Sequence, residues 1–302
     1  MLILVLGANG QVGFELVRAL APLGAIECTT RSGRLPGTGR CHALDIAEPE
    51  AVVALVERLR PRVVVNAAAY TAVDRAEDEP DLAFKVNAEA VAALAAACAR
   101  QRAWLLHYST DYVFSGQGAR PWREQDATAP LGVYGASKRA GESAIVESGC
   151  AHFILRTSWV YAARGQNFLR TMLRLAEQRP QLSVVADQRG APTPARWIAA
   201  ATAALLARTD LDAPRGELLH LTAAGECSWY AFAWAIFEEA LAAGLIAAAP
   251  EVRAITTAEY PTRAKRPAFS RLDNAKLQQG YGLALPDWRI GLQQVIAELA
   301  RD

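Results

Sequence analysis

The alternation of short apolar runs with helical patterns limits most strongly what this chain can fold into. Continuous apolar strands joined through helices are typical of a parallel sheet that is covered on both faces. The pattern therefore predicts an α/β fold with a doubly wound parallel sheet of the Rossmann type. The expected strands are 2–7, 25–30, 62–69, 103–110 and 152–158, and the expected helices are 11–22, 48–59, 81–101 and 132–149.

The rhythm loosens after residue 157, which indicates a second, smaller α/β lobe that binds substrate. We expect residues 1–156 to form the dinucleotide-binding domain, with return segments around 182–223, and residues 157–181 and 224–302 to form the lobe. Helices are expected at 166–177, 194–208 and 228–241, with short strands at "LSVVA" and "ELLHL".

Composition excludes several kinds of partner. The 302 residues carry 32 Lys and Arg against 31 Asp and Glu, so no overall field favours nucleic acid or an anionic membrane. Five scattered cysteines without a C-x-x-C pair favour reduced thiols over disulfides or zinc. The start "MLILVLGANG" lacks a basic segment, and the alanine-rich runs fall short of the roughly twenty residues of a membrane span. We expect a cytoplasmic protein.

The first motif is a glycine-rich turn directly after the first strand. "GANGQVG" contains Gly7, Gly10 and Gly13, and Gln11 and Val12 open the following helix. Glycine permits a tight turn and lets a pyrophosphate approach backbone amides at a helix N-terminus, where the dipole favours anions. The motif predicts a bound dinucleotide; a purely structural turn is the alternative.

The second strand ends without the acidic residue that usually binds a ribose 2′-hydroxyl. "CTTRSGR" places Thr30, Arg31 and Arg34 there instead. An arginine pairs with a 2′-phosphate that a carboxylate would repel, so the pattern favours NADPH and leaves NADH open. Alternatively, Arg31 is a solvated loop charge.

Two further segments are candidates for cofactor contact. Asp45, followed by Ile46 in "ALDI", is placed to reach the adenine, although capping of the next helix is an equal alternative. In "NAAAYT", Ala69, Tyr70 and Thr71 follow the third long strand, where small residues let the backbone approach the nicotinamide ribose. Tight helix packing is the other interpretation of this segment.

Polar side chains gather where a buried strand ends. "HYSTDYVF" brings Ser109, Thr110 and Asp111 to the carboxyl end of a strand, where open α/β sheets bind their ligands. Two hydroxyls and a carboxylate are suited to holding a carbonyl oxygen. A loop with Asx and Ser turns is the simpler alternative.

"VYGASKRAGE" places Tyr134 and Lys138 one helical turn apart on one face. Reduction of a ketone by hydride transfer builds negative charge on oxygen, which then needs a proton donor. We expect Tyr134 to be this acid, Lys138 to lower its pKa and to hold the nicotinamide ribose, and Thr110 or Ser109 to bind the same oxygen.

These motifs, with "LRTSWVYA", "NFLRTMLRLA", "DQRGAPT" and "RPAFSRLD", resemble the extended short-chain dehydrogenase/reductase superfamily and, within it, the dTDP-4-dehydrorhamnose reductase family. The resemblance covers nearly the whole chain. It implies NAD(P)H-dependent reduction of the C4 ketone of dTDP-4-dehydro-β-L-rhamnose to dTDP-β-L-rhamnose, the last step in making this nucleotide sugar. It makes Tyr134 the proton donor, Lys138 its partner and Thr110 the residue that tunes the donor.

The resemblance also implies substrate contacts. Thr110, Asp111 and Trp159 are expected to touch the deoxysugar, since an indole face suits its methyl-bearing side; a core tryptophan is the alternative. Arg266 in "RPAFS" is expected to neutralise the diphosphate, unless it is an exposed loop arginine.

Several points stay open in the sequence. The family is associated with Mg²⁺ bound by surface carboxylates, sometimes at a dimer interface; Glu15 is a candidate ligand without a surrounding acidic cluster. A metal is therefore unknown, and monomer and homodimer are both open. The rival functions are a sugar-nucleotide 4-epimerase with retained NAD and a non-catalytic regulatory subunit resembling the β subunit of methionine adenosyltransferase.

Overall fold

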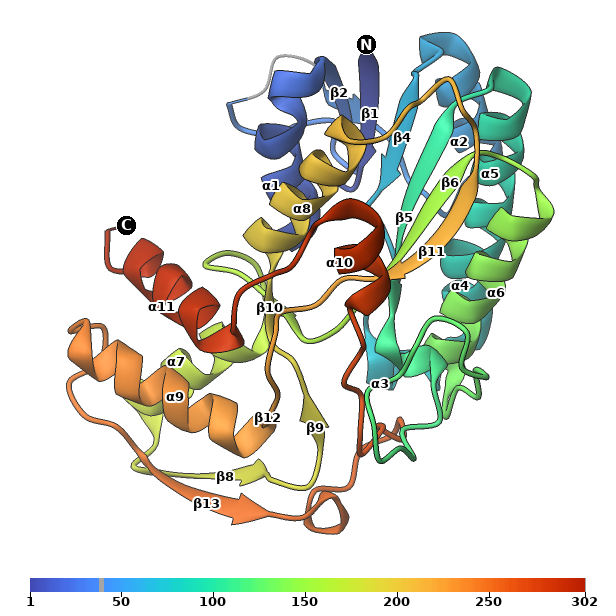
Figure 1. Cartoon of the computed structure of the whole chain (residues 1–302). Helices are drawn as coiled ribbons and strands as arrows, with labels where there is room; N and C mark the ends of the chain where they lie inside the picture. The colour runs from blue at the N-terminus through green and yellow to red at the C-terminus, as the bar shows by residue number, and fades with distance from the viewer. Residues whose placement is uncertain (38–40, 302) are drawn as a thin grey trace.

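A sheet of seven parallel strands organises the larger domain (Figure 1). The structure is a computed structural model that describes residues 1–37 and 41–301. The strand order is β11-β6-β5-β4-β1-β2-β3. The strands are β1 (Leu2–Leu6), β2 (Ala25–Thr30), β3 (Cys41–Ala43), β4 (Val63–Asn66), β5 (Trp104–Thr110), β6 (His152–Thr157) and β11 (Gly216–His220).

Helices cover both faces of this sheet, as the apolar runs require. Successive residues of β1 point to opposite faces, so Ile3 and Val5 join one core and Leu4 and Leu6 the other. The predicted doubly wound fold is confirmed. The first face carries α1 (Gln11–Leu20) and α8 (Ala195–Ala207), and the second carries α2 (Pro49–Leu59), α5 (Ala90–Gln101) and α6 (Val133–Glu147).

The chain reverses its direction of travel through the sheet between β1 and β4. From β1 it adds β2 and β3 on one side, and from β4 it adds β5, β6 and β11 on the other. A crevice at the carboxyl ends of the strands is expected at such a switch point. The glycine turn after β1, the "NAAAYT" segment after β4 and the "STD" segment of β5 all lie at these ends.

The expected helix 81–101 is divided by a wider turn. It consists of α4 (Pro80–Phe84), a π-helical segment η2 (Lys85–Glu89) and α5, and α3 (Val73–Ala76) precedes it. Among the described residues, the run Pro80–Gln101 is the one helix long and apolar enough to cross a membrane by length and composition. Half of its most apolar window is buried, and α5 packs against α2 and α6.

The smaller lobe has its own aromatic core, built around Tyr161, Phe232 and Trp288. Its helices are α7 (Phe168–Gln178), α9 (Trp229–Ala242) and α11 (Trp288–Leu299). Its strands pair as β8 (Gln181–Val185) with β13 (Glu251–Ile255), β7 (Val160–Tyr161) with β10 (Thr193–Pro194), and β9 (Arg189–Gly190) with β12 (Cys227–Ser228). Short 3₁₀ turns are η1 (Ala21–Leu23), η3 (Asp111–Val113) and η4 (Thr257–Glu259).

Two of the expected lobe boundaries are wrong. The return to the larger domain does not begin at 182, because β8 alternates exposed and buried residues and pairs with β13 inside the lobe. The segment 224–302 does not stay in the lobe either. Helix α10 (Ala275–Tyr281) packs on β11, and its Leu277 belongs to the core of the larger domain. The segments that return within 182–223 are α8 and β11.

Candidate active site

The glycine turn after β1 has no room for side chains. Gly7 has a φ of 75°, and a Cβ added to Gly13 would lie 2.1 Å from the carbonyl oxygen of Gly7. Helix α1 has Gly10 at its N-cap, no side-chain cap and no acidic residue in its first turn. The amides at Gln11 and Val12 therefore face a concave turn without a competing anion, which fits a dinucleotide pyrophosphate.

The end of β2 carries exposed arginines, as the sequence suggested. Thr30 is buried, and its hydroxyl accepts a hydrogen bond from the Arg34 amide (3.1 Å). Arg31 is exposed next to it. The threonine therefore shapes the turn, and contact of Arg31 with a 2′-phosphate stays a prediction.

Asp45 does not cap helix α2. Its carboxylate accepts from the Ala47 amide (3.0 Å) in a local turn, and the N-cap of the helix is Glu48. The capping alternative is therefore wrong. Asp45 is exposed and Ile46 is half-buried, and their contact with adenine stays a prediction.

The "NAAAYT" segment is fixed by a residue that the sequence reading overlooked. Asn87 accepts a hydrogen bond from the Tyr70 amide (2.9 Å), donates one to the Tyr70 carbonyl (3.0 Å) and donates another to Ser137 (3.0 Å). Asn87 lies in the π-helical segment, whose extra residue per turn brings this side chain to the strand end. Ala69 is half-buried and Thr71 exposed beside it.

The structure brings the predicted acid and hydroxyl together. Thr110 lies near enough to the Tyr134 phenol to lower its pKa against the effect of burial, and the Thr110 hydroxyl donates to Asp111 Oδ1 (3.1 Å). Thr110 also accepts from the Tyr112 amide (3.2 Å) and so caps the short turn η3. Ser109 is buried, and its hydroxyl has no partner among the described residues. The two interpretations of the "STD" segment, turn and site, are thus compatible.

The expected effect of Lys138 on Tyr134 is wrong in this structure. Burial raises the pKa of Tyr134 to about 12, with Thr110 opposing this shift. Burial also lowers the pKa of Lys138 to about 8, which the charge of Glu142 partly offsets. Desolvation disfavours both charged forms, and the Lys138 amine lies against β5, 2.9 Å from His107 Nε2 and 2.6 Å from the Tyr108 carbonyl oxygen.

Trp159 has an unusual backbone and a covered face. Its φ is 48°, a left-handed value that bulky residues rarely adopt. Its ring stacks on Trp229 with 3.5 Å between centroids and 4° between planes, and its edge lies against Gly190. It is half-buried, so contact with a sugar stays a prediction.

Arg266 already has an anionic partner. Its guanidinium donates to both carboxylate oxygens of Asp74, at 3.1 and 2.6 Å. The alternative of an exposed loop arginine is wrong, because the side chain is largely buried. Binding to a diphosphate would have to compete with Asp74, and this role stays a prediction.

Comparison with known proteins supplies the family. The family model for the RmlD substrate binding domain matches residues 1–301. A dTDP-4-dehydrorhamnose reductase of Escherichia coli is 49% identical over 300 residues, covering 99% of this chain and 98% of the relative. The chain belongs to the dTDP-4-dehydrorhamnose reductase family. The Burkholderia thailandensis member is 46% identical over 305 residues, covering 99% of each chain.

Solved members of the family have the same fold. The dTDP-4-dehydrorhamnose reductase of Clostridium acetobutylicum superposes with a TM-score of 0.89 at 35% identity, covering 99% of each chain. The Bacillus anthracis enzyme, solved in complex with NADP, gives 0.86 at 34% identity and covers 98% of this chain and 99% of its own. A UDP-glucose 4-epimerase of Thermus thermophilus, at 22% identity and a TM-score of 0.81, shows the shared fold alone.

Glu15, the candidate Mg²⁺ ligand of this family member, is engaged by arginines. It is 7% exposed and lies 3.8 Å from Arg164 and 4.0 Å from Arg196. Both arginines also pair with Glu298, at 3.6 and 2.7 Å. In the described part of the chain, no three His, Cys, Asp or Glu side chains gather as metal ligands. The donor set at Glu15 therefore does not fit a divalent cation.

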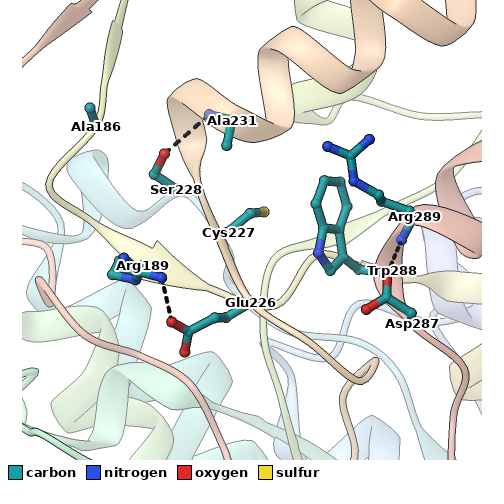
Figure 2. A pocket seen from close by; sticks show the side chains of 9 residues that line it. All are labelled: Ala186, Arg189, Glu226, Cys227, Ser228, Ala231, Asp287, Trp288 and Arg289. Carbon is teal, nitrogen blue, oxygen red and sulfur yellow. Dashed lines mark hydrogen bonds and ion pairs between the residues drawn. The ribbon is translucent and has the colours of Figure 1, made fainter.

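A separate hollow of about 410 Å³ lies in the smaller lobe (Figure 2). Arg189 pairs with Glu226 on one wall, and Arg289 lies over the ring of Trp288 on another. None of the residues predicted for the site lines it. Gly190, next to Arg189, abuts Trp159, but neither Trp159 nor Tyr134 lines the hollow.

Sequence reasoning missed two further buried residues near Lys138. Asn66 ends β4 and His107 lies in β5, and they face each other in the sheet register. The polar letters in otherwise apolar runs, "VVVN" and "LLHY", were the available signal. A buried polar side chain needs a partner, and here the partners are each other and Lys138.

Proposed function

We propose that this chain reduces the C4 ketone of dTDP-4-dehydro-β-L-rhamnose to dTDP-β-L-rhamnose. The observation that carries the proposal is the proximity of the Tyr134 phenol to Thr110, at the sheet edge that also holds the glycine turn. Two reductases of this name are 49% and 46% identical to this chain over nearly its full length, which supports the choice of ketone.

The residues around the switch point would hold a nicotinamide dinucleotide. The turn at Gly7, Gly10 and Gly13 would take the pyrophosphate, and the Ala69–Thr71 segment and Lys138 would lie along the nicotinamide ribose. The bound dinucleotide supplies the hydride. The chain itself must then orient the carbonyl, exclude water and deliver a proton.

Tyr134 is the proton donor of the proposed reaction. Its raised pKa keeps the phenol protonated at neutral pH, so it is present in the form that an acid needs. An alkoxide formed from the ketone is a stronger base than a phenolate, so transfer to it runs downhill. Thr110 supplies a second hydrogen bond to the same oxygen when its hydroxyl proton turns from Asp111 to the substrate. Asp111 and Trp159 hold the deoxysugar.

Arg31 favours NADPH in this proposal. A guanidinium forms charge-assisted hydrogen bonds with a 2′-phosphate that NADH lacks. We expect Arg31→Ala to weaken NADPH roughly tenfold or more and to leave NADH nearly unchanged, since one such bond contributes about 1.5–3 kcal/mol. The ratio of kcat/KM for the two cofactors measures this effect. An unchanged ratio would assign selectivity elsewhere.

The test of the reaction is the oxidation of NADPH and NADH with enzymatically generated dTDP-4-dehydrorhamnose, for the wild type and for Tyr134→Phe. We expect turnover that requires this ketone and falls about 10²-fold or more in the variant. Tyr161→Phe is the matched control, because the Tyr161 hydroxyl is buried in the lobe without a partner among the described residues.

Other outcomes would identify the rivals. Interconversion of a nucleotide sugar without net loss of NADPH would indicate an epimerase. Protein that binds a dinucleotide but turns over no ketone would indicate a regulatory subunit. Neither Mg²⁺ nor a homodimer is needed by the proposed chemistry, and cytoplasmic location and monomeric or dimeric state stay predictions.

A further inference from the structure

A buried chain of hydrogen bonds ends at the catalytic lysine. The Ala68 amide donates to Asn66 Oδ1 (3.1 Å), Asn66 Nδ2 lies 3.0 Å from His107 Nδ1, and His107 Nε2 lies 2.9 Å from Lys138 Nζ. Asn66, His107 and Lys138 are each at most 2% exposed. Since water does not reach these groups, each donor must meet an acceptor within the chain.

The Ala68 backbone amide sets the direction of every hydrogen bond in this series. A backbone N–H can only donate, so the side-chain atom of Asn66 that faces it must be the oxygen. The amide nitrogen of Asn66 then faces His107 and donates to Nδ1. Burial lowers the pKa of His107 well below its usual value, so the ring is neutral and carries its single proton on Nε2.

The proton on Nε2 points at Lys138. A neutral amine can accept it with its lone pair and still donate to the Tyr108 carbonyl oxygen at 2.6 Å. An ammonium has no lone pair, so it would place two donors face to face. To remove this clash of two donors, the side-chain amide of Asn66 would have to rotate by half a turn. The backbone amide of Ala68 would then lack an acceptor.

We propose that Asn66 and His107 are positioning residues for the catalytic lysine, and that their chain of hydrogen bonds presents an N–H to Lys138 Nζ and thereby favours the neutral amine. The inference deepens the proposed function, since it concerns the lysine of that site, and rests on it for the word catalytic. Two strand residues, Asn66 and His107, would thus control whether Lys138 of helix α6 is protonated.

The charges around Lys138 do not oppose this arrangement strongly. Glu142 is the nearby anion, but both of its oxygens accept from Arg156, at 2.7 and 2.6 Å. Helical segments packed on α6 carry charges that are paired elsewhere, Arg75 with Glu79 and Lys85 with Glu48. The titratable side chains that interact with Lys138 are His107 of β5 and Glu142 of α6, while the Tyr108 side chain points to the opposite face of the sheet and bonds to Thr202. Asp111 of η3, Tyr134 of α6 and Arg156 of β6 are the other titratable groups of the neighbouring elements.

Nuclear magnetic resonance can test the proposal without any turnover. The chain has four histidines and four lysines, so ring nitrogens and lysine side chains can be resolved with residue-specific ¹⁵N and ¹³C labels. We expect a titration midpoint of about 8 for Lys138, and the Nε2–H tautomer for His107 at pH values above this midpoint, where the amine is neutral. The Nδ1–H tautomer would overturn the proposal, and this reading needs no variant to fold.

Asn66→Asp should reverse the direction of the hydrogen bonds between residue 66, His107 and Lys138. The introduced carboxylate accepts from both the Ala68 amide and the ring, so the proton moves to Nδ1 and Nε2 becomes an acceptor for an ammonium. We expect the Lys138 midpoint to rise by at least one pH unit, a tenfold change in its protonation equilibrium. An unchanged midpoint in the folded variant would overturn the proposal.

Asn274→Asp is the matched control, because it adds the same charge to a side chain whose hydrogen bonds, among the described residues, all go to Thr222 and none to Asn66, His107 or Lys138. We expect it to leave the midpoint and the tautomer unchanged. The ketone assay separates the two hypotheses. Failure of reduction with the predicted tautomer and midpoint would sink the proposed function alone, and active enzyme with the opposite tautomer would sink the role of Asn66 and His107 alone.

Discussion

Asp111 holds a carboxyl group where almost no water reaches it. The residue is 2% exposed, and burial raises its pKa to about 7, while the neighbouring hydroxyls of Ser270 and Thr110 lower it. At pH values between its pKa in the unfolded chain and its higher pKa in the folded protein, such a group binds more protons in the folded state. Its contribution therefore destabilises the fold as the pH rises from about 4 to about 7.

We expect Asp111→Asn to remove this pH dependence while it impairs reduction. The shift of roughly three pH units means that ionised Asp111 destabilises the fold by at most about 4 kcal/mol. This destabilisation is present in full above pH 7 and absent near pH 4. The variant should therefore exceed the wild type in free energy of unfolding at pH 8 and match it more closely at pH 5. Urea denaturation at both pH values measures the difference. A constant difference between the two proteins would contradict the argument.

Individual site residues were predictable where the signal was local. Tyr134 and Lys138 are one turn apart, and Thr110 ends a strand, so a motif finds them. The pairing of Asn66 with His107 depends on the register of β4 against β5, which no local pattern contains. The expected effect of Lys138 on Tyr134 failed because it depends on burial, which a sequence does not state.

At the scale of elements, the turn between β1 and α1 depends on backbone contact. We expect Gly13→Ala to weaken dinucleotide binding at least tenfold, because its new Cβ would lie 2.1 Å from the Gly7 carbonyl oxygen and must displace backbone. Titration of NADPH by fluorescence measures the dissociation constant.

Gly280→Ala is the control for this change. Gly280 lies in α10, and an added Cβ would meet nothing within 4 Å. Alanine is favoured over glycine in a helix by about 1 kcal/mol, so this variant should bind NADPH normally and unfold no more readily. Equal binding by both variants would mean that the turn tolerates a wider backbone.

The elements of the parallel sheet were predictable because each is a continuous apolar run followed by a helix. The elements of the lobe were harder to predict from the sequence. Strand β8 alternates, but it pairs with β13 from a segment about seventy residues later, which does not alternate and so gives no strand signal of its own. The π-helical segment at Lys85–Glu89 looks like ordinary helix in sequence, because its wider turn follows from tertiary contacts of Asn87.

At the scale of the whole molecule, one cluster of four charges ties both parts together. Glu15 comes from α1 and Arg196 from α8, while Arg164 follows β7 and Glu298 lies in α11 of the lobe. Each carboxylate has two guanidinium partners, so the cluster is complete without an added cation. Solvent screens these pairs, because the Arg164 and Arg196 side chains are 36% and 46% exposed, while the two carboxylates are the more buried members.

We expect reduction by this enzyme to be insensitive to a chelator. Mg²⁺ would have to displace guanidinium groups from Glu15, so ketone-dependent rates with EDTA and with added Mg²⁺ should agree. Arg196→Ala exposes two carboxylates and is the variant in which Mg²⁺ should raise the melting temperature. Loss of wild-type activity in EDTA that Mg²⁺ restores would contradict the assignment.

The stacked rings of Trp159 and Trp229 both pack against the aromatic core of the lobe. Trp159 directly precedes β7, and Trp229 begins α9. Two indoles 3.5 Å apart and nearly parallel couple their electronic transitions, and the coupled pair has a circular dichroism signal that neither ring has alone. The molecule thus carries a spectroscopic gauge of how β7 and α9 pack within the lobe, read without any added label.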